Sequence, residues 1–432
     1  MNPARTLAFR SLCKTANKSV LSTVERDEVL QSASLSTRDE ALYNKLFFGV
    51  LEKKIPLDFL IARLVTTPLD TLDLPVLCLL ESGLYQILYL NRIPDHAAID
   101  ETVSLAKHVA PAAQTLVNAV LRRAADQKDD LFSLLNLPGV KGLSVRYGYP
   151  RYLVKLWNQA YGADACLSIM NAQNTPPPLT VRVNTLCITK DEYLLQSKER
   201  GILFSQSPLC KNALVCQTTQ NPRDLYGYDE GFFFVQDAAA QQAIESLGAQ
   251  SGERILDLCS APGGKSFSAA LAMQNTGFIL SMDLSEKRLK KVSDGARRLG
   301  LSIIQTRQND ATAEDTSLIG AFDRVICDVP CSGFGVIAKK PDIRQKKQAD
   351  LADLYPLQKS ILDQAGKYVR LGGVLLYATC TLNPAENEEA TDSFLEKNPH
   401  FHRLNAPRTV FPVGGENDGF FYDLLEKTDD PD

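Results

Sequence analysis

Apolar residues follow a helical period over the N-terminal part of the chain, up to about residue 135. They recur at positions i, i+3, i+4 and i+7, which is the spacing of amphipathic helices. Segment 74–89 is more broadly apolar, as expected for a helix at the centre of a small helical bundle. The predicted helices are 41–51, 58–64, 74–89, 95–108 and 111–123, with helix starts or breaks expected at Pro56, Pro68, Pro75 and Pro94.

The periodicity changes from helical to strand-like in the middle of the chain. Gly and Pro residues gather in 127–150, a composition typical of a linker. Segment 153–170 then predicts a helix whose Trp157 packs in the core. A small α+β subdomain is predicted from strands 179–184, 213–217 and 231–235 and helix 191–198, and an RNA-recognition-motif-like (RRM-like) topology is one candidate for it.

Strands and helices alternate further along, which predicts a mostly parallel, doubly wound, Rossmann-like sheet. The apolar run 255–258 leads into the turn Pro262-Gly263-Gly264, and a helix is expected from Phe267 to Met273. Such a strand–turn–helix unit is typical of the start of a nucleoside-binding domain. The other predicted strands are 278–282, 303–306, 324–327, 374–378 and 420–425, and the other predicted helices are 237–246, 286–299, 351–369 and 385–396.

A chain of 432 residues is too long for one ordinary domain. We predict an all-α bundle at 1–135, a linker with a connecting helix at 136–170, the α+β subdomain at 171–235 and the α/β domain at 236–432.

The composition indicates a globular protein, with 44% hydrophobic and 23% charged residues. The net charge of −4 means that binding to nucleic acid would require a local basic face. No run of eighteen apolar residues predicts a membrane span, and segment 1–11 lacks the apolar core of a secretory signal. The ten cysteines contain no C-x-x-C pair, so we expect free thiols in the cytoplasm and no metal site.

The sequence narrows the chemical class of the ligand that the α/β domain is expected to bind. Gly264-Lys265-Ser266 ends like a phosphate loop, but Cys259 occupies the position of its first glycine, and G-x-G-x-x-G is absent. Acidic residues follow successive predicted strands, among them Asp283, Asp310 and Asp328. Each alone could cap a turn or a helix. Together they favour a nucleoside without phosphates, and S-adenosylmethionine fits better than ATP or NAD.

Two cysteines stand where predicted strands end and polar loops begin. Cys331 lies in segment 328–333 and Cys380 in segment 377–388. The usual interpretation of a cysteine is a small buried hydrophobe, which we adopt for Cys13, Cys78, Cys166, Cys187, Cys210, Cys216 and Cys327.

Several of these segments resemble known families. Segments 92–103 and 116–123 resemble the NusB family of RNA-binding helical domains. The C-terminal half resembles the NOL1/NOP2/Sun family of RNA 5-methylcytosine methyltransferases, with small departures at Ser260, Val329 and Thr381. The segments that carry this second resemblance are 231–237, 257–266, 328–333, 340–343 and 379–388.

The resemblance implies a reaction and a set of site residues. Cys380 would add to C6 of a cytosine, Cys331 would assist release, and Asp328 would hold or protonate the base at N3. With a NusB-like domain in front, the implied substrate is 16S ribosomal RNA, bound by an enzyme expected to be monomeric. The residues implied to bind S-adenosyl-L-methionine are Cys259, Ser260, Ala261, Pro262, Gly263, Gly264, Lys265, Asp283, Arg288, Asp310 and Asp328.

Lys265 has two interpretations, because it could lower the pKa of a neighbouring thiol or form a purely structural ion pair. Two basic clusters are candidates for contacts with the RNA backbone. The less favoured cluster is Lys287, Arg288, Lys290 and Lys291. The more favoured cluster is Lys339, Lys340, Arg344, Lys346 and Lys347.

Other functions remain open at this point. A transfer-RNA 5-methylcytosine methyltransferase is disfavoured by the NusB-like segment, and a non-catalytic RNA-binding assembly factor is disfavoured by the presence of both cysteines and the acidic residues. A DNA cytosine methyltransferase would have its nucleophile in the Pro-Cys motif, and the additional Thr379-Cys380 argues against it.

Overall fold

The protein consists of two compact units, and the residues of each unit pack mainly against one another. The computed structural model describes residues 2–17, 21–176, 179–218 and 221–429. One unit consists of Met1–Cys166 with Lys339–Lys346, and the other of Leu167–Ala338 with Lys347–Asp432. The short segment Lys339–Lys346 therefore packs with the helical unit, although it follows the predicted Cys331 loop in sequence. None of the helices in the described ranges combines the length and the apolar character needed to cross a bilayer.

The first unit is helical, as its period predicts. Helix α4 (Leu74–Tyr89) lies in the core, where Leu79, Leu80 and Leu84 are fully buried. It begins and ends at the predicted residues. The helices are α1 (Pro3–Ala16), α2 (Ser22–Ser32), α3 (Thr37–Leu64), α4 (Leu74–Tyr89), α5 (Asp95–Val109), α6 (Gln114–Asp126), α7 (Lys128–Ser133), α8 (Gly139–Tyr147) and α9 (Arg151–Tyr161), followed by α10 (Ala163–Ala172).

Pro56 does not break a helix, so the prediction of two helices at 41–51 and 58–64 was wrong. Helix α3 continues through Pro56. A proline inside a helix costs about 3 kcal/mol. Leu57, Leu60 and Ile61 follow it and are fully buried. Each such side chain contributes roughly 1.5–3 kcal/mol on burial, which outweighs the cost of the proline.

The Gly- and Pro-rich stretch 127–150 contains structure that its composition did not predict. It forms α7 and α8, and Leu131, Leu135 and Val145 from this stretch are buried in the helical core. The helix predicted over 153–170 is divided at Gly162, where φ is 85°. Trp157 is fully buried and packs against Tyr149, which confirms its core position.

The α+β subdomain is a four-stranded antiparallel sheet in the order β2-β3-β1-β4. Strand β2 was not predicted, because it has three residues and two of them are exposed. The elements are β1 (Leu179–Val183), α11 (Lys190–Glu199), β2 (Phe204–Gln206), β3 (Ala213–Cys216) and β4 (Phe233–Val235). Cys187, predicted to be buried, is exposed in the turn after β1, and Cys13 is only partly buried.

The large sheet has the order β10-β12-β9-β8-β5-β6-β7, with β11 paired to β12. Its central pairs are parallel, and β12 runs antiparallel to β9. The strands are β5 (Arg254–Asp257), β6 (Phe278–Asp283), β7 (Ile304–Gln308), β8 (Phe322–Asp328), β9 (Val369–Thr379), β10 (Phe401–Arg403), β11 (Arg408–Val410) and β12 (Phe420–Lys427). The helices are α12 (Ala238–Leu247), α13 (Gly264–Ala272), α14 (Glu286–Leu299), α15 (Leu354–Tyr368) and α16 (Glu388–Lys397).

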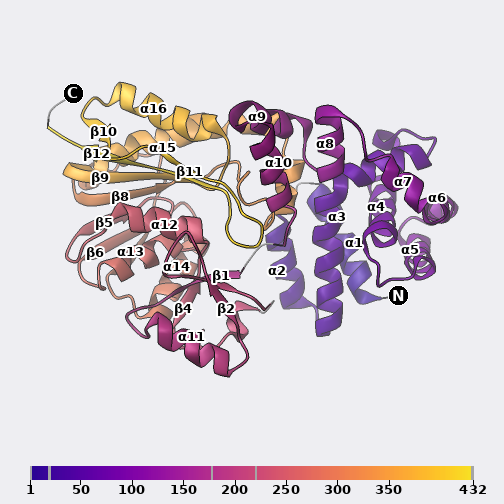
Figure 1. Ribbon diagram of the computed structural model, residues 1–432, viewed down its shortest axis with the longest axis horizontal. Coiled ribbons are helices and arrows are strands. Elements are labelled where there is room, and N and C mark those ends of the chain that lie inside the picture. The colour runs from indigo at the N-terminus through magenta and orange to yellow at the C-terminus, as the bar shows by residue number, and fades with distance from the viewer. Residues whose placement is uncertain (1, 18–20, 177–178, 219–220, 430–432) are drawn as a thin grey trace. The chain divides into compact units, whose positions relative to one another are not determined.

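Helices cover both faces of this sheet (Figure 1). Side chains alternate along β5, so Ile255 packs with the core of α12, α13 and α14, whereas Leu256 packs with the core of α15 and α16. Strands buried on both faces are typical of parallel sheets. Polar groups with a chemical role must therefore lie at the strand ends, and chain order reverses at β5, where such folds bind ligands.

The antiparallel subdomain packs against the C-terminal end of α14. Asn184, fully buried, donates hydrogen bonds of 2.9 Å to the carbonyl oxygens of Gly231 and Leu299. A guanidinium nitrogen of Arg298 donates to the carbonyl oxygen of Phe233 at 3.1 Å. These contacts explain why both sheets belong to one unit.

Gly231→Ala should destabilise this packing. Gly231 has φ of 73°, and a Cβ there would lie 2.2 Å from the carbonyl oxygen of Arg298. The matched control is Gly201→Ala, since Gly201 has φ of 74° and nothing within 4 Å of its Cβ position. We expect Gly201→Ala to cost about 1–2 kcal/mol from backbone strain alone. Gly231→Ala should cost roughly 2 kcal/mol more in denaturant unfolding, and equal costs would contradict the packing argument.

Candidate active site

The turn after β5 is shaped by a glycine. Asp257 ends the strand, and Gly263 precedes α13 with φ of 113°, a conformation that side chains rarely adopt. A Cβ at Gly263 would also lie 2.4 Å from the Phe267 ring. The turn therefore keeps its backbone close to α13, whose N-terminus begins at Gly264 and offers free N–H groups.

Asp283 and Arg288 hold this turn from the next strand and helix. Asp283 ends β6 and accepts a hydrogen bond of 3.3 Å from the backbone N–H of Ala261. Arg288 donates to the carbonyl oxygen of Ala261 at 2.8 Å and lies 3.4 Å from the Asp283 carboxylate. Three of the predicted cofactor residues are thus brought together, and Arg288 supports the turn directly.

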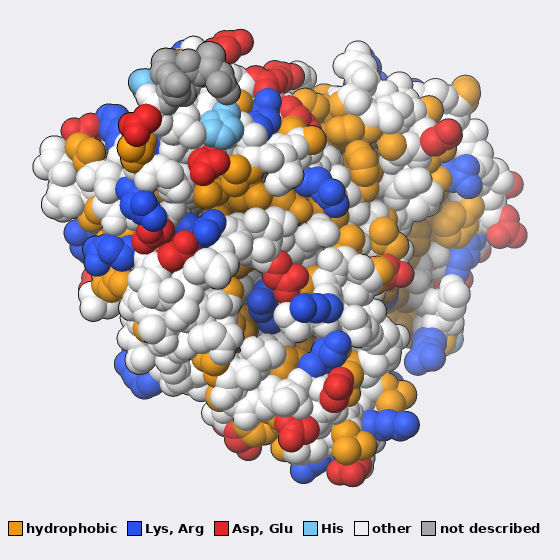
Figure 2. All heavy atoms as spheres, turned by 60° about the vertical axis from the view of Figure 1, so that its left-hand side comes forward, with side chains coloured by type: hydrophobic (Ala, Val, Ile, Leu, Met, Phe, Trp, Pro, Cys, Tyr) orange, Lys and Arg blue, Asp and Glu red, His pale blue; other side chains and the backbone are white. Residues whose placement is uncertain are grey.

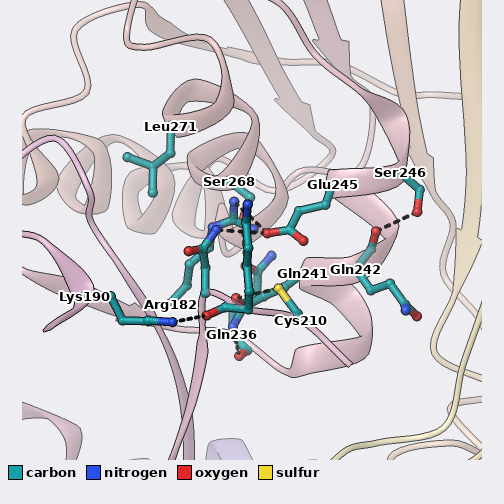
Figure 3. Close-up of polar contacts among 12 residues, drawn as sticks. Arg182, Lys190, Cys210, Gln236, Gln241, Gln242, Glu245, Ser246, Ser268 and Leu271 are labelled. Atoms are coloured by element: carbon teal, nitrogen blue, oxygen red, sulfur yellow. Dashed lines mark hydrogen bonds and ion pairs between the residues drawn. The ribbon is translucent and has the colours of Figure 1, made fainter. Parts of the chain in front are cut away.

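Gln236, to which the sequence assigned no role, anchors the first turn of α13. Its side chain donates to the carbonyl oxygen of Gly264 at 3.1 Å and accepts from the Ser268 hydroxyl at 2.5 Å. Its backbone carbonyl accepts from Gln241, and its N–H bonds to Thr180 in β1. Figure 3 shows Gln236 grouped with Gln241 and Ser268. The turn is therefore tied to the antiparallel subdomain.

Lys265 reaches from α13 to the end of β8. Its ammonium lies 2.5 Å from the carboxylate of Asp328. Burial alone would lower the pKa of Lys265, but the charges of Asp328, Asp257 and Cys380 raise it above its ordinary value. The structure therefore contains the ion pair, and the charge of Lys265 also acts on the Cys380 sulfur.

Asp257 is a fully buried carboxyl group with an unused oxygen. One oxygen accepts a hydrogen bond of 2.6 Å from Ser266, and among the described residues the other oxygen has no partner. Burial is the main reason why the pKa of Asp257 rises to about 7. An unpaired buried polar atom beside a glycine turn suits a ligand with a positively charged or N–H donor group. Asp257 ends β5 as Asp283 ends β6, so the strand-end rule could have singled it out.

The two predicted cysteines are neighbours. Strands β8 and β9 pair in parallel with Asp328 opposite Ala378, which places the loops after them side by side. The sulfur atoms of Cys331 and Cys380 are 3.3 Å apart. The hydrogen bond to Cys380, burial and nearby negative charges raise the pKa of Cys331 well above its usual value.

The two cysteine loops also bond directly to each other. The hydroxyl groups of Ser332 and Thr381 are 2.6 Å apart, and Thr381 accepts a hydrogen bond of 3.2 Å from the N–H of Phe334. Gly335 donates to the carbonyl oxygen of Cys380 at 3.0 Å. Thr381 thus retains the hydroxyl function of the serine that is usual in the family it resembles.

Other predicted residues lie in less distinctive surroundings. Asp310 is exposed and caps its own turn, with hydrogen bonds from the N–H and hydroxyl of Thr312. Ser260 helps to form the turn, through its N–H to Met282 and its carbonyl to Gly263. Burial raises the pKa of Cys259, as expected for an inert thiol.

The prediction that Arg344 contacts RNA was wrong. Only 2% of its surface is exposed, and it donates hydrogen bonds to the Tyr147 carbonyl oxygen and the Tyr149 hydroxyl within the helical unit. Lys287 and Lys290 line an open groove of about 630 Å³ along α14. On the face shown in Figure 2, basic and acidic side chains are interspersed.

Three known protein families match successive segments of the chain. The NusB family matches residues 2–126. A ferredoxin-like domain of RsmF/B-like methyltransferases matches 149–221, and the 16S rRNA methyltransferase RsmB/F family matches 244–426.

Individual relatives extend over nearly the whole length. The probable ribosomal RNA small subunit methyltransferase B of Bacillus subtilis (strain 168) is 36% identical over 402 residues, covering 92% of this chain and 89% of that protein. Ribosomal RNA small subunit methyltransferase B of Escherichia coli O1:K1 / APEC is 34% identical over 432 residues, covering 97% and 99%. The crystal structure of PH0851 is similar in fold, with a TM-score of 0.79, 24% identity and 98% coverage of both chains.

Asp257→Asn should change how stability depends on pH. The pKa of about 7 in the folded protein exceeds the value of about 3.9 for an unfolded aspartate. Between these values the folded state holds a proton that the unfolded state has released, so the free energy of unfolding falls as the pH rises. The asparagine variant should lack this decline and be more stable than wild type by about 1–3 kcal/mol at pH 8.

Denaturant unfolding from pH 4 to pH 8 measures the difference between the two proteins. The exposed Asp294→Asn serves as the control and should keep the wild-type profile. A constant difference between Asp257→Asn and wild type across this range would contradict the elevated pKa.

Proposed function

Because this chain belongs to the RsmB/F family of 16S ribosomal RNA methyltransferases, we propose that it transfers a methyl group from S-adenosyl-L-methionine to C5 of a cytosine in 16S ribosomal RNA. The observation that carries the proposal is the pair of thiols at 3.3 Å, at strand ends next to the turn after β5. A single strand-end cysteine would be compatible with many functions, whereas a sulfur pair beside a nucleoside-type turn suits addition to a pyrimidine and its reversal.

The residues at the carboxyl edge fit the cofactor. The unpaired oxygen of Asp257 would accept a hydrogen bond from its ammonium group, and the backbone of the glycine turn would face its amino-acid end. Asp283 would bond the ribose hydroxyls, and Asp310 would lie toward the adenine. When bound, S-adenosylmethionine supplies an electrophilic methyl group.

The nucleophile of the proposed reaction is Cys380. Cytosine C5 is too weak a nucleophile by itself, and addition of the Cys380 thiolate at C6 makes it reactive. The ammonium of Lys265 favours the thiolate form of Cys380 by its charge. Asp328, paired with Lys265, would hold a proton at N3 between its carboxylate and the ring, and this proton would neutralise the negative charge that builds up during the addition.

Cys331 would act when the product leaves. Once C5 carries the methyl group, a base would take up the C5 proton, the electron pair of that C–H bond would restore the C5–C6 double bond, and the Cys380 sulfur would leave C6 with the electron pair of the C–S bond. The elevated pKa keeps Cys331 protonated at neutral pH, so its S–H can donate to the departing sulfur 3.3 Å away. The target base has to leave its stack to reach these groups. Lys287 and Lys290, which line the groove along α14, would contact the RNA backbone.

Cys380→Ala should abolish methyl transfer. Removing the nucleophile should reduce the rate by about 10³-fold or more, because the uncatalysed attack by C5 is so slow. The measurement is transfer of labelled methyl groups to naked 16S ribosomal RNA, with Cys187→Ala as the control because Cys187 is exposed and distant in sequence. A fully active Cys380→Ala would contradict the assignment, and activity of wild type on transfer RNA alone would contradict the substrate.

Cys331→Ala should trap a covalent complex between protein and RNA. Addition by Cys380 would proceed, but the departing sulfur would lack its proton donor. The complex should migrate as an RNA-linked band on a denaturing gel, and the double variant Cys331→Ala/Cys380→Ala should lack it. Rapid turnover by Cys331→Ala without an adduct would remove Cys331 from the release step.

A further inference from the structure

Glu386 is a buried carboxylate placed between the two cysteine loops. It has no exposed surface, and its oxygens accept hydrogen bonds of 2.8 Å from the Ser332 N–H, from Gln358 and from Asn383. All three donors are neutral amide groups. Burying a charged group is costly, and three short hydrogen bonds offset that cost.

Glu386 and Gln358 together hold the backbone on both sides of Cys331. Glu386 binds the N–H of Ser332, which follows Cys331. Gln358 donates one hydrogen bond to Glu386 and another, of 2.9 Å, to the carbonyl oxygen of Pro330, which precedes Cys331. The backbone around Cys331 is therefore held on both sides by one pair of side chains.

The same carboxylate is tied to the loop that carries Cys380. The side chain of Asn383, three residues after Cys380, donates to the Glu386 carboxylate. The backbone carbonyl oxygen of Asn383 accepts from the backbone N–H of Glu386. The adjacent Asn387 accepts from the Thr379 hydroxyl at 2.6 Å and donates to the Thr381 carbonyl at 3.0 Å. Glu386 thus connects both loops at a single point.

We propose that Glu386 is a positioning residue that holds the Cys331 sulfur opposite the Cys380 sulfur for product release. The inference rests on the proposed function, in which Cys331 donates to the departing sulfur. It assigns Glu386 no contact with the RNA or the cofactor. Its influence acts through the Ser332 N–H and through its charge.

The charges around Cys331 agree with this role. The hydrogen bond to Cys380 and burial contribute most to the raised pKa of Cys331, and the charges of Cys380, Glu386 and Asp328 raise it further. Helix α15 contributes the neutral Gln358. The titratable groups that face Cys331 are Cys380, Glu386 and Tyr377 from β9 and the segment after it, and Asp328 from β8, which is itself paired with Lys265 from α13.

Glu386→Gln tests the proposal with little change in volume. The amide retains one acceptor oxygen but places an N–H group where the carboxylate accepted, so it must oppose a donor from Ser332, Gln358 or Asn383. Release from the Cys380 adduct should slow by at least about tenfold, because a shift near 1 Å at a reacting group can cost more than that. The adduct should accumulate, while the KM for S-adenosylmethionine should stay within about twofold of wild type.

The pH profile separates this role from a merely structural one. Loss of the Glu386 charge lowers the pKa of Cys331, because that charge disfavours the thiolate. The alkaline limb of the release rate should therefore move to lower pH in Glu386→Gln. A general loss of folding would reduce the rate at every pH and leave the limb in place.

Two further variants keep the test decisive. Glu389→Gln changes an exposed carboxylate three residues away and should behave as wild type. If thermal unfolding shows that Glu386→Gln does not fold, Gln358→Leu removes both Gln358 hydrogen bonds and should slow release in the same direction, by a smaller factor.

The outcomes also separate this inference from the proposed function. If wild type does not methylate the RNA, or Cys331→Ala forms no adduct, the proposed function fails and this inference fails with it. If wild type methylates and Cys331→Ala traps an adduct, while Glu386→Gln or Gln358→Leu releases product at the wild-type rate with an unshifted limb, this inference alone is overturned.

Discussion

The parallel register of β8 and β9 is the constraint on which the proposed site depends. Asp328 pairs with Ala378, so the loops that carry Cys331 and Cys380 leave the sheet together at its carboxyl edge. A slip by one residue would shift one loop by about 3.3 Å and turn every side chain of the strand to the opposite face. Since both faces are occupied by separate apolar cores, such a slip would bury the wrong side chains, and the sheet core thereby sets the distance between the sulfurs.

The turn after β5 depends on the same edge but is held from several directions. Arg288 and Asp283 bond to Ala261, while Gln236 bonds to Gly264 and links α13 to the antiparallel subdomain. A ligand that meets a pre-formed turn loses less conformational entropy on binding than one that must order a mobile loop. The role of the antiparallel sheet is in this respect mechanical, because its strand β1 supports Gln236 through Thr180.

Long elements with a strong period could be predicted from the sequence, and short or context-dependent features could not. Residues 74–89 and 286–299 form α4 and α14 with both ends as predicted, because their apolar stripes are long and bounded by polar residues. Strands β2, β10 and β11 have three residues each, too few to show an alternation, and pairing with neighbours defines them. The strand ends that carry Asp283, Asp328, Cys331 and Cys380 were found because apolar runs stop there. Glu386 and Gln236 were missed as site residues because their partners, such as Gln358 and Gly264, are distant in sequence.

Two chemically identical thiols at 3.3 Å need different surroundings if they are to have different roles. The structure supplies a charge of opposite sign on each side. The ammonium of Lys265 acts on Cys380, while the hydrogen bond to Cys380 and burial, assisted by the charge of Glu386, raise the pKa of Cys331. A thiolate beside a thiol can share one proton, so in the proposed reaction the attacking sulfur would be stabilised before the base arrives and its proton donor would already be in place when it departs. The different surroundings of the two sulfurs are therefore what supports the proposed assignment of nucleophile and proton donor, since the side chains themselves are the same.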